Sequence, residues 1–142
     1  MMEGEMNREA YVFLNSARVL HYQYLRLKAK RDELESCLLP GAIRYDKDKV
    51  QRSPEDPMSK IISEINELEN EMARVQHNKQ IQVEKIYKAI SRLESEEEKT
   101  SLTMRYVSRI PVKKIAEEMG YSEPTIYRFM NQGAEKMIRI IK

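Results

Sequence analysis

Residues 112–131 read VKKIAEEMGYSEPTIYRFMN, and this stretch decides the fold of the C-terminal third of the chain. Its apolar residues recur at helical spacing in two runs that a glycine and a serine separate, which predicts two helices joined by a short turn. Ala116 is small enough for the second helix to cross the first closely. Gly120 can adopt the positive φ that such a turn requires, and Ser122 can cap the second helix. We therefore predict a helix-turn-helix.

The two helices are expected to share one apolar core, with Tyr121 filling the corner between them. Glu123 and Pro124 suit the first turn of the second helix, because a carboxylate favours the positive end of the helix dipole and proline has no amide hydrogen to lose there. The residues expected in this core are Ile115, Met119, Ile126, Phe129, Met130 and Met137.

The polar face of the second helix has the chemistry to contact DNA. Arg128 can bind guanine through two hydrogen bonds, Gln132 can bind adenine, and Thr125 can contact a thymine methyl group. Basic residues beside them are suited to phosphates, which set orientation and salt dependence rather than sequence choice. The candidate DNA-binding residues are Lys113, Lys114, Ser122, Glu123, Thr125, Tyr127, Arg128, Gln132, Lys136 and Arg139.

The distribution of charge favours the same segment. The whole chain has a net charge of +2, but residues 100–142 carry eight Lys and Arg against four Glu. Residues 58–99 are acidic on balance, and residues 1–57 are neutral. A basic C-terminal segment is typical of a surface that binds nucleic acid.

The N-terminal half is expected to contain long amphipathic helices. Apolar residues at alternating steps of four and three predict one helix from Arg8 to Leu39, where Pro40 and Gly41 would stop it. Residues 40–57 hold three of the five prolines and no sustained period, so we expect an irregular linker there. From Pro57 the apolar seam resumes as far as Leu93, which fits one long helix or two nearly collinear ones.

These two stripes can pair within one chain as an antiparallel hairpin or between chains, and the sequence leaves both arrangements open. After them, Ser95 is placed to cap a further helix whose first turn is acidic and which is expected to end near Arg109. Leu102 and Tyr106 would form its buried side, together with Met104 or Val107.

Residues 86–137 resemble region 4 of sigma-70-type factors. The matching features are the leading helix KIYKAISRL, an acidic helix start, LTMRYV, VKKIAEEMGYS and a recognition helix ending in AEKM. With its helical N-terminal half, the chain is similar to the ArpU and RinA-like late-gene regulators of phages that infect Gram-positive bacteria. The resemblance implies a transcription activator of phage genes. It departs from the sigma pattern at Arg109, where glycine is frequent, and at Glu123-Pro124, which replaces a more basic pair. A counterpart of sigma region 2 is also missing, which favours an activator over a free-standing sigma factor.

We therefore predict an all-α protein with an N-terminal coiled-coil-like arm of antiparallel long helices, residues 1–85, and a C-terminal sigma region 4-like helix-turn-helix domain, residues 86–142. The predicted function is sequence-specific, non-enzymatic transcription regulation in the cytoplasm of a bacterial host. The expected partner is double-stranded DNA, with the N-terminal helices mediating self-association or contact with RNA polymerase. No membrane partner is expected, because no apolar run approaches the roughly 20 residues of a membrane span.

Two other functions stay open: a DNA-packaging protein similar to a phage terminase small subunit, and a structural or adaptor coiled coil whose terminal hairpin binds only protein. No cofactor or metal is expected, since His21 and His77 lack ligands at metal spacing. Cys37 has no partner motif for nucleophilic catalysis. The acidic residues 94–98 are interpreted as a solvated helix start, because consecutive side chains on a helix point in different directions.

Overall fold

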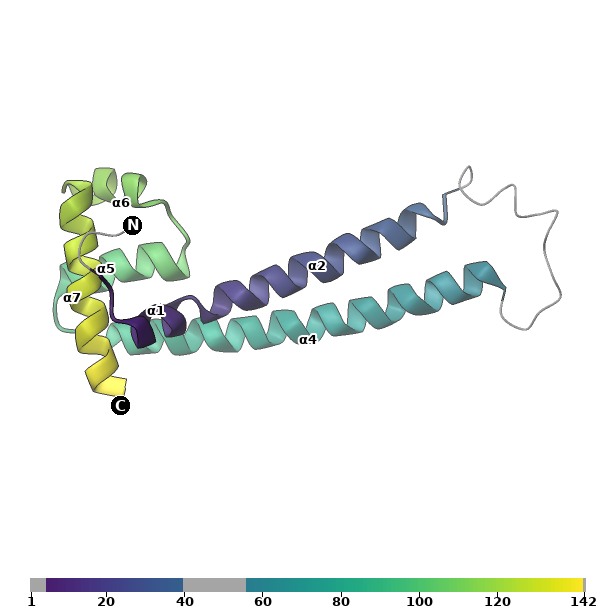
Figure 1. Ribbon diagram of the computed structural model, residues 1–142, viewed down its shortest axis with the longest axis horizontal. Coiled ribbons are helices and arrows are strands. Elements are labelled where there is room, and N and C mark those ends of the chain that lie inside the picture. Colours follow the sequence, from purple (N-terminus) through teal and green to yellow (C-terminus); the bar gives the residue numbers. More distant parts are fainter. Residues whose placement is uncertain (1–4, 40–55, 142) are drawn as a thin grey trace. The chain divides into compact units, whose positions relative to one another are not determined.

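The computed structural model describes residues 5–39 and 56–141 (Figure 1). Within these ranges every regular element is a helix, so the predicted all-α class is confirmed. The elements are α1 Arg8–Leu14, α2 Ser16–Ser36, α4 Pro57–Ser91, α5 Glu96–Leu102, the π-helix η2 Thr103–Val107, α6 Val112–Met119 and α7 Glu123–Ile141.

The chain divides into two compact units. One comprises Met1–Arg18 with Gln80–Lys142, and the other comprises Val19–Lys79. The α1 helix belongs to the same unit as α7, whereas the predicted domain division placed residues 1–85 together. That division stays a prediction, since a compact packing unit and an independently folding domain are different properties. The linker expected at 40–57 lies outside the described residues except for its last two, and Pro57 already begins α4.

The expectation of one helix from Arg8 to Leu39 is wrong, because the helix is interrupted at Asn15. The Asn15 side-chain amide donates to the Tyr11 carbonyl at 2.9 Å, and the Ser16 hydroxyl donates to the Phe13 carbonyl at 2.6 Å. The Asn15 backbone amide also bonds the Tyr11 carbonyl, so α1 closes at Asn15 with local side-chain hydrogen bonds to its last carbonyls. After the interruption α2 runs only as far as Ser36.

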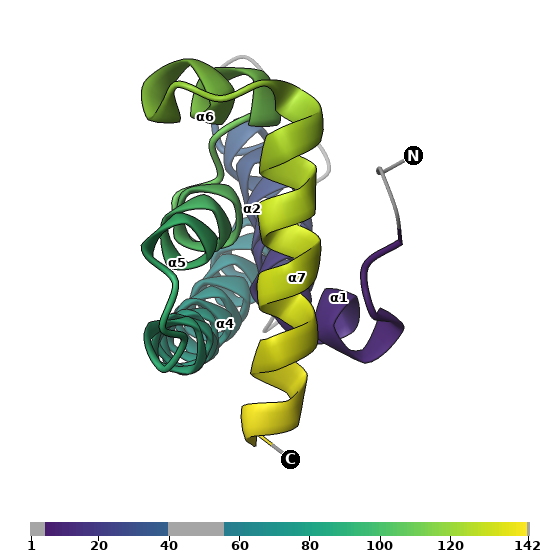
Figure 2. The same cartoon turned by 90° about the vertical axis from the view of Figure 1, so that its left-hand side faces the viewer.

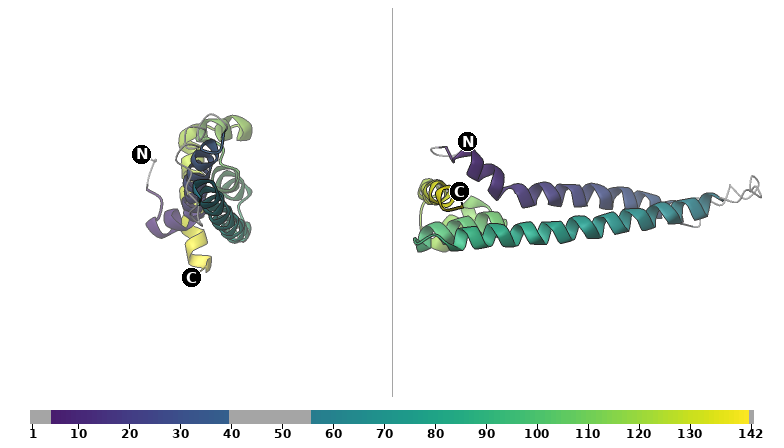
Figure 3. Two further views of the ribbon diagram at one scale, coloured as in Figure 1. Left: turned by 90° about the vertical axis from the view of Figure 1, so that its right-hand side faces the viewer. Right: turned by 90° about the horizontal axis from the view of Figure 1, so that it is seen from below.

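In the second unit, α2 and α4 lie side by side and run in opposite directions (Figures 1 and 3). Two contacts define their register. Arg31 forms an ion pair with Glu69 at 2.9 Å, and Lys79 lies 3.2 Å from a ring nitrogen of His21. A pair of helices has little interior, and the described residues of this unit that are both apolar and buried are Ile65 and Met72.

The first unit has a continuous apolar core in which α7 is central. Figure 2 shows α7 with α5 and α6 on one side and α1 on the other. The α5 and α7 helices cross at Gly133, where an added Cβ would lie 2.8 Å from Cδ1 of Leu102. Side chains from every helix of this unit are buried in the core, among them Leu14, Ile86, Ile90, Leu102, Ile115, Ile126, Met130 and Met137.

Ser95 caps α5 as predicted, accepting a hydrogen bond from the Glu98 amide at 3.2 Å. The helix that the sequence predicts up to about Arg109 extends to Val107, but its backbone changes to π geometry over η2, which the sequence did not predict. The Ser108 amide binds the carbonyl of Thr103, five residues earlier, at 3.0 Å. Leu102 and Tyr106 are buried as predicted. Arg109 has a φ of 62°, in the left-handed region that favours glycine.

Candidate nucleic-acid interface

A three-residue turn connects α6 to α7. Gly120 has a φ of 80°, and its amide binds the Ala116 carbonyl at 2.9 Å, which closes the C-terminus of α6. The Ser122 hydroxyl accepts from the Thr125 amide at 3.4 Å and caps α7. Gly120 and Ser122 therefore have the positions and geometry that the sequence predicted for them.

The apolar sides of α6 and α7 face the common core. Ile115 and Ala116 of α6 are buried, and so is Ile126 of α7. Tyr121 contacts Phe129 edge-on, with ring centroids 4.9 Å apart, but remains 41% exposed and does not close the corner completely. The two helices thus form a packed pair with a fixed turn.

The face of α7 that points away from the core is polar. Arg128, Gln132 and Arg139 are exposed on it, four to eleven residues apart along the helix. The Arg128 guanidinium lies 5.6 Å from the centre of the Phe129 ring, a cation–π contact that holds it beside the turn. Of the other candidate DNA-binding residues, Lys113, Lys114, Ser122, Glu123 and Lys136 are exposed, while Thr125 and Tyr127 are half-buried.

Lys136 has a specific partner within the protein. Its ammonium group donates to both carboxylate oxygens of Glu98, at 3.0 and 3.2 Å. Glu98 is only 4% exposed, so the interpretation of this residue as part of a solvated helix start is wrong. Glu98 lies on the buried side of α5 together with Ser101 and Leu102. This side of α5 packs against α7, so Glu98 lies at the crossing of the two helices. Lys136 is therefore first of all the counter-ion of a buried carboxylate.

The structure places Tyr127 in a cleft of about 380 Å³ that the sequence did not indicate. We call it the arginine–tyrosine cleft. Its walls come from α1, the α1–α2 junction, the first turns of α2, η2 and α7, and its remaining lining residues are Tyr11, Asn15, Arg18, Arg105, Tyr106 and Met130. Arg105 belongs to the LTMRYV motif, but the sequence offers no signal that would bring Arg18 beside it.

Tyr106 forms the buried wall of the cleft. Burial raises the pKa of its phenol, and the guanidinium of Arg105 acts in the opposite direction. Its hydroxyl donates to the sulfur of Met6 at 3.9 Å. Arg105 also donates to the Ile110 carbonyl at 3.3 Å, at the connection between η2 and α6. Arg105 thus both lines the cleft and hydrogen-bonds the segment that leads into α6.

Comparison with known proteins places the chain in a family. A family model described as "Protein of unknown function (DUF1492)" matches residues 42–138. The chain belongs to this family. The matched segment of the chain includes α4, α5, η2, α6 and most of α7. No curated protein and no solved structure matches the chain.

Within residues 5–39 and 56–141, no group of three or more His, Cys, Asp or Glu side chains could hold a metal ion. In the same ranges, no helix combines the length and the apolar character needed to cross a membrane. The candidate interface therefore consists of the α6–α7 pair and the arginine–tyrosine cleft beside it.

Proposed function

We propose that the chain is a sequence-specific DNA-binding transcription regulator whose α6–α7 pair is a helix-turn-helix motif. The observation that carries this proposal is the turn between the two helices. Gly120 in the left-handed conformation and the Ser122 cap hold α7 against α6, while the outward face of α7 keeps its polar residues exposed. A recognition helix requires this combination, since it must be held rigidly and still enter a major groove.

The side chains on that face divide into two roles. Arg128 and Gln132 are proposed to contact base edges, because their planar groups match guanine and adenine. Lys113 and Lys114, exposed at the start of α6, are proposed to bind phosphates. The net positive charge of residues 100–142 and the resemblance to region 4 of sigma-70-type factors and to ArpU and RinA-like regulators support this assignment.

The second unit is proposed to mediate self-association or contact with RNA polymerase. Apolar side chains of α2 remain exposed on it, including Val19, Tyr22 and Leu25. Light scattering of the purified chain tests this part of the proposal. A monomer or dimer is expected, whereas a large ring would favour the DNA-packaging function instead.

Selection from a random library of duplex DNA with the purified full chain tests the proposed function. We expect enrichment of one sequence, and Arg128→Ala should weaken its binding by about 1 to 3 kcal/mol and relax the preference at one position. Lys113→Ala should weaken binding to all sequences about equally. Recovery of no preferred sequence, or unchanged discrimination in Arg128→Ala, would contradict the proposal.

A further inference from the structure

The arginine–tyrosine cleft has the chemistry of an anion site. Arg18 and Arg105 line it from different helices, and a guanidinium group is the side chain best suited to hydrogen-bond a phosphate. Tyr11, which is 47% exposed, and Asn15 also line it, and one amide hydrogen of Asn15 is donated to the Tyr11 carbonyl. The residues that line this cleft include no acidic side chain, so it favours a negatively charged ligand.

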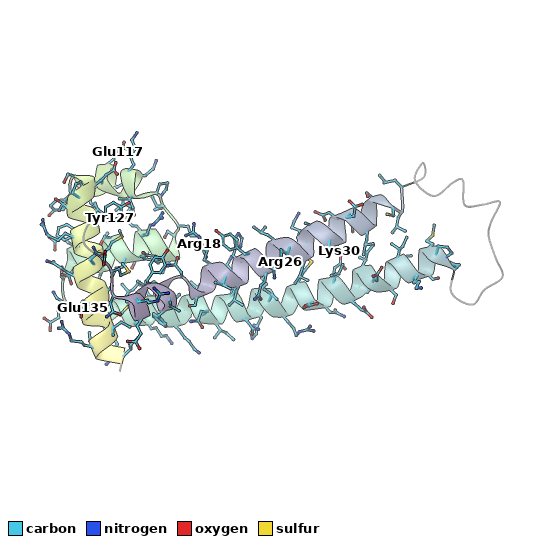
Figure 4. All side chains as sticks on the ribbon, in the orientation of Figure 1. Arg18, Arg26, Lys30, Glu117, Tyr127 and Glu135 are labelled. Atoms are coloured by element: carbon cyan, nitrogen blue, oxygen red, sulfur yellow. The ribbon has the colours of Figure 1, made fainter. Side chains whose placement is uncertain are left out.

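The backbone around the cleft is also unusual. Arg105 is provided by η2, and π-geometry within a helix is found frequently at functional sites. Arg105 and Tyr106 of η2 line the same cleft as Arg18 and Tyr127, which come from α2 and α7. Figure 4 labels Arg18 on the first turns of α2 and Tyr127 on α7.

The position of Tyr127 relates the cleft to the polar face of α7. Tyr127 precedes Arg128, and successive side chains diverge by about 100° around an α-helix. A helix of about 10–12 Å diameter nearly fills a major groove that is about 12 Å wide, so sugar–phosphate backbones lie along both its sides. If Arg128 points at the bases, Tyr127, about 100° away around α7, is directed toward the side on which one of these backbones would lie.

We propose that the arginine–tyrosine cleft binds a phosphate group, and that in the DNA complex this group is a backbone phosphodiester next to α7. This inference rests on the proposed function, because it extends the DNA-binding surface from the α6–α7 pair to α1, α2 and η2. Arg18 and Arg105 bind the phosphate oxygens, and the phenol of Tyr127 donates a further hydrogen bond.

The salt dependence of DNA binding tests the inference. Each phosphate contact contributes about 0.9 to the slope of log K against log salt concentration. The Arg18→Ala/Arg105→Ala variant should therefore lose about 0.9 of the slope. Between about 50 and about 200 mM salt, its affinity should fall about 3.5-fold less than that of the natural chain. Arg92→Ala, an exposed arginine between α4 and α5, makes the same change of charge as one of these substitutions and should leave the slope unchanged.

Two further measurements keep the result interpretable. Arg18→Ala alone should also lower the slope, and it leaves intact the Arg105 hydrogen bond to the Ile110 carbonyl. Titration of the full chain with inorganic phosphate, followed by NMR of the guanidinium groups, should shift the signals of Arg18 and Arg105 but not that of Arg92. Together with the salt slope, this titration distinguishes a site for free phosphate from one for a phosphodiester of DNA.

Each outcome decides one part of the inference. A lower slope in the cleft variants supports a backbone phosphate in the cleft. An unchanged slope with shifted guanidinium signals overturns the assignment to DNA, and an unchanged slope without shifts overturns the phosphate site. If the natural chain does not bind DNA, the proposed function fails, and the phosphate titration alone decides whether the cleft is an anion site.

Discussion

The crossing of α5 and α7 at Gly133 allows a prediction with two opposing contributions. Alanine is more favourable than glycine within a helix by about 1 kcal/mol. The added Cβ, however, would lie 2.8 Å from Cδ1 of Leu102 and 3.1 Å from Cβ of Glu98. Carbon atoms in good contact are about 3.5–4.0 Å apart, so the neighbours must move.

Leu102 has little room to move, because its side chain is fully buried. Overpacking of a filled core costs typically about 1–3 kcal/mol, which exceeds the gain in helix propensity. Gly133→Ala should therefore destabilise the chain by about 1 kcal/mol. In a Leu102→Ala background the obstructing methyl group is absent and only the 3.1 Å contact with Cβ of Glu98 remains tight, so the same substitution should stabilise the chain, by less than about 1 kcal/mol.

Urea unfolding of the four chains of this double-mutant cycle, followed by circular dichroism, measures the reversal. The cycle isolates the contact between residues 102 and 133, because the helix propensity of alanine is present in both backgrounds. Stabilisation by Gly133→Ala in both backgrounds would refute the close crossing of α5 and α7.

Three further predictions concern the unit formed by Met1–Arg18 and Gln80–Lys142. Arg109→Gly should be more stable than Arg109→Ala by about 1 kcal/mol in urea unfolding, because both lose the side chain but only glycine tolerates a φ of 62° without strain. Equal stabilities would contradict the left-handed backbone. Lys136→Met should cost about 1–3 kcal/mol, because it leaves the Glu98 carboxylate buried without its ion pair, and Glu98→Gln in the same chain should recover part of the loss. No recovery would show that the ammonium group is not the relevant partner. The pKa of the Tyr106 phenol is higher in the folded chain than in the unfolded chain. As the pH rises, the unfolded chain therefore loses this proton before the folded chain does. The stability that this group contributes is therefore complete below pH 10.0 and is lost as the pH rises through its folded pKa. Tyr106→Phe should make unfolding less dependent on pH above that value, and an unchanged dependence would argue against burial of the phenol.

Local signals in the sequence were sufficient for much of the C-terminal region. Gly120 and Ser122 act within one turn of their own positions, so their roles follow from neighbouring residues alone. The same is true of Ser95, which caps α5. Burial of Ile115 and Ile126 follows from helical spacing.

Features that depend on backbone register or on distant partners could not be predicted in this way. The spacing of apolar residues around Asn15 is that of a continuous helix, so it does not indicate that α1 ends at Leu14 and α2 begins at Ser16. The π-geometry of η2 leaves the spacing of Leu102 and Tyr106 unchanged. Glu98 looks like any acid at a helix start, because its partner Lys136 lies 38 residues further along the chain.

The candidate site likewise has one part that follows from local sequence signals and one part that depends on tertiary packing. The residues of the α6–α7 pair could be predicted from one continuous stretch of sequence. The arginine–tyrosine cleft could not, since Arg18 and Arg105 come together only through the tertiary packing of α2 and η2. Sequence patterns therefore indicate the motif, and the three-dimensional structure extends the surface around it.

The measurement that tests the central claim most directly is fluorescence anisotropy of a labelled random-sequence duplex, titrated with the purified full chain over a range of salt concentrations. The account predicts binding at low ionic strength that weakens linearly on a log–log plot as salt rises, with a dissociation constant in the range of about 10⁻⁶ to 10⁻⁴ M at physiological salt. Absence of binding at the lowest salt concentration would contradict the assignment of α6 and α7 to a DNA-binding motif.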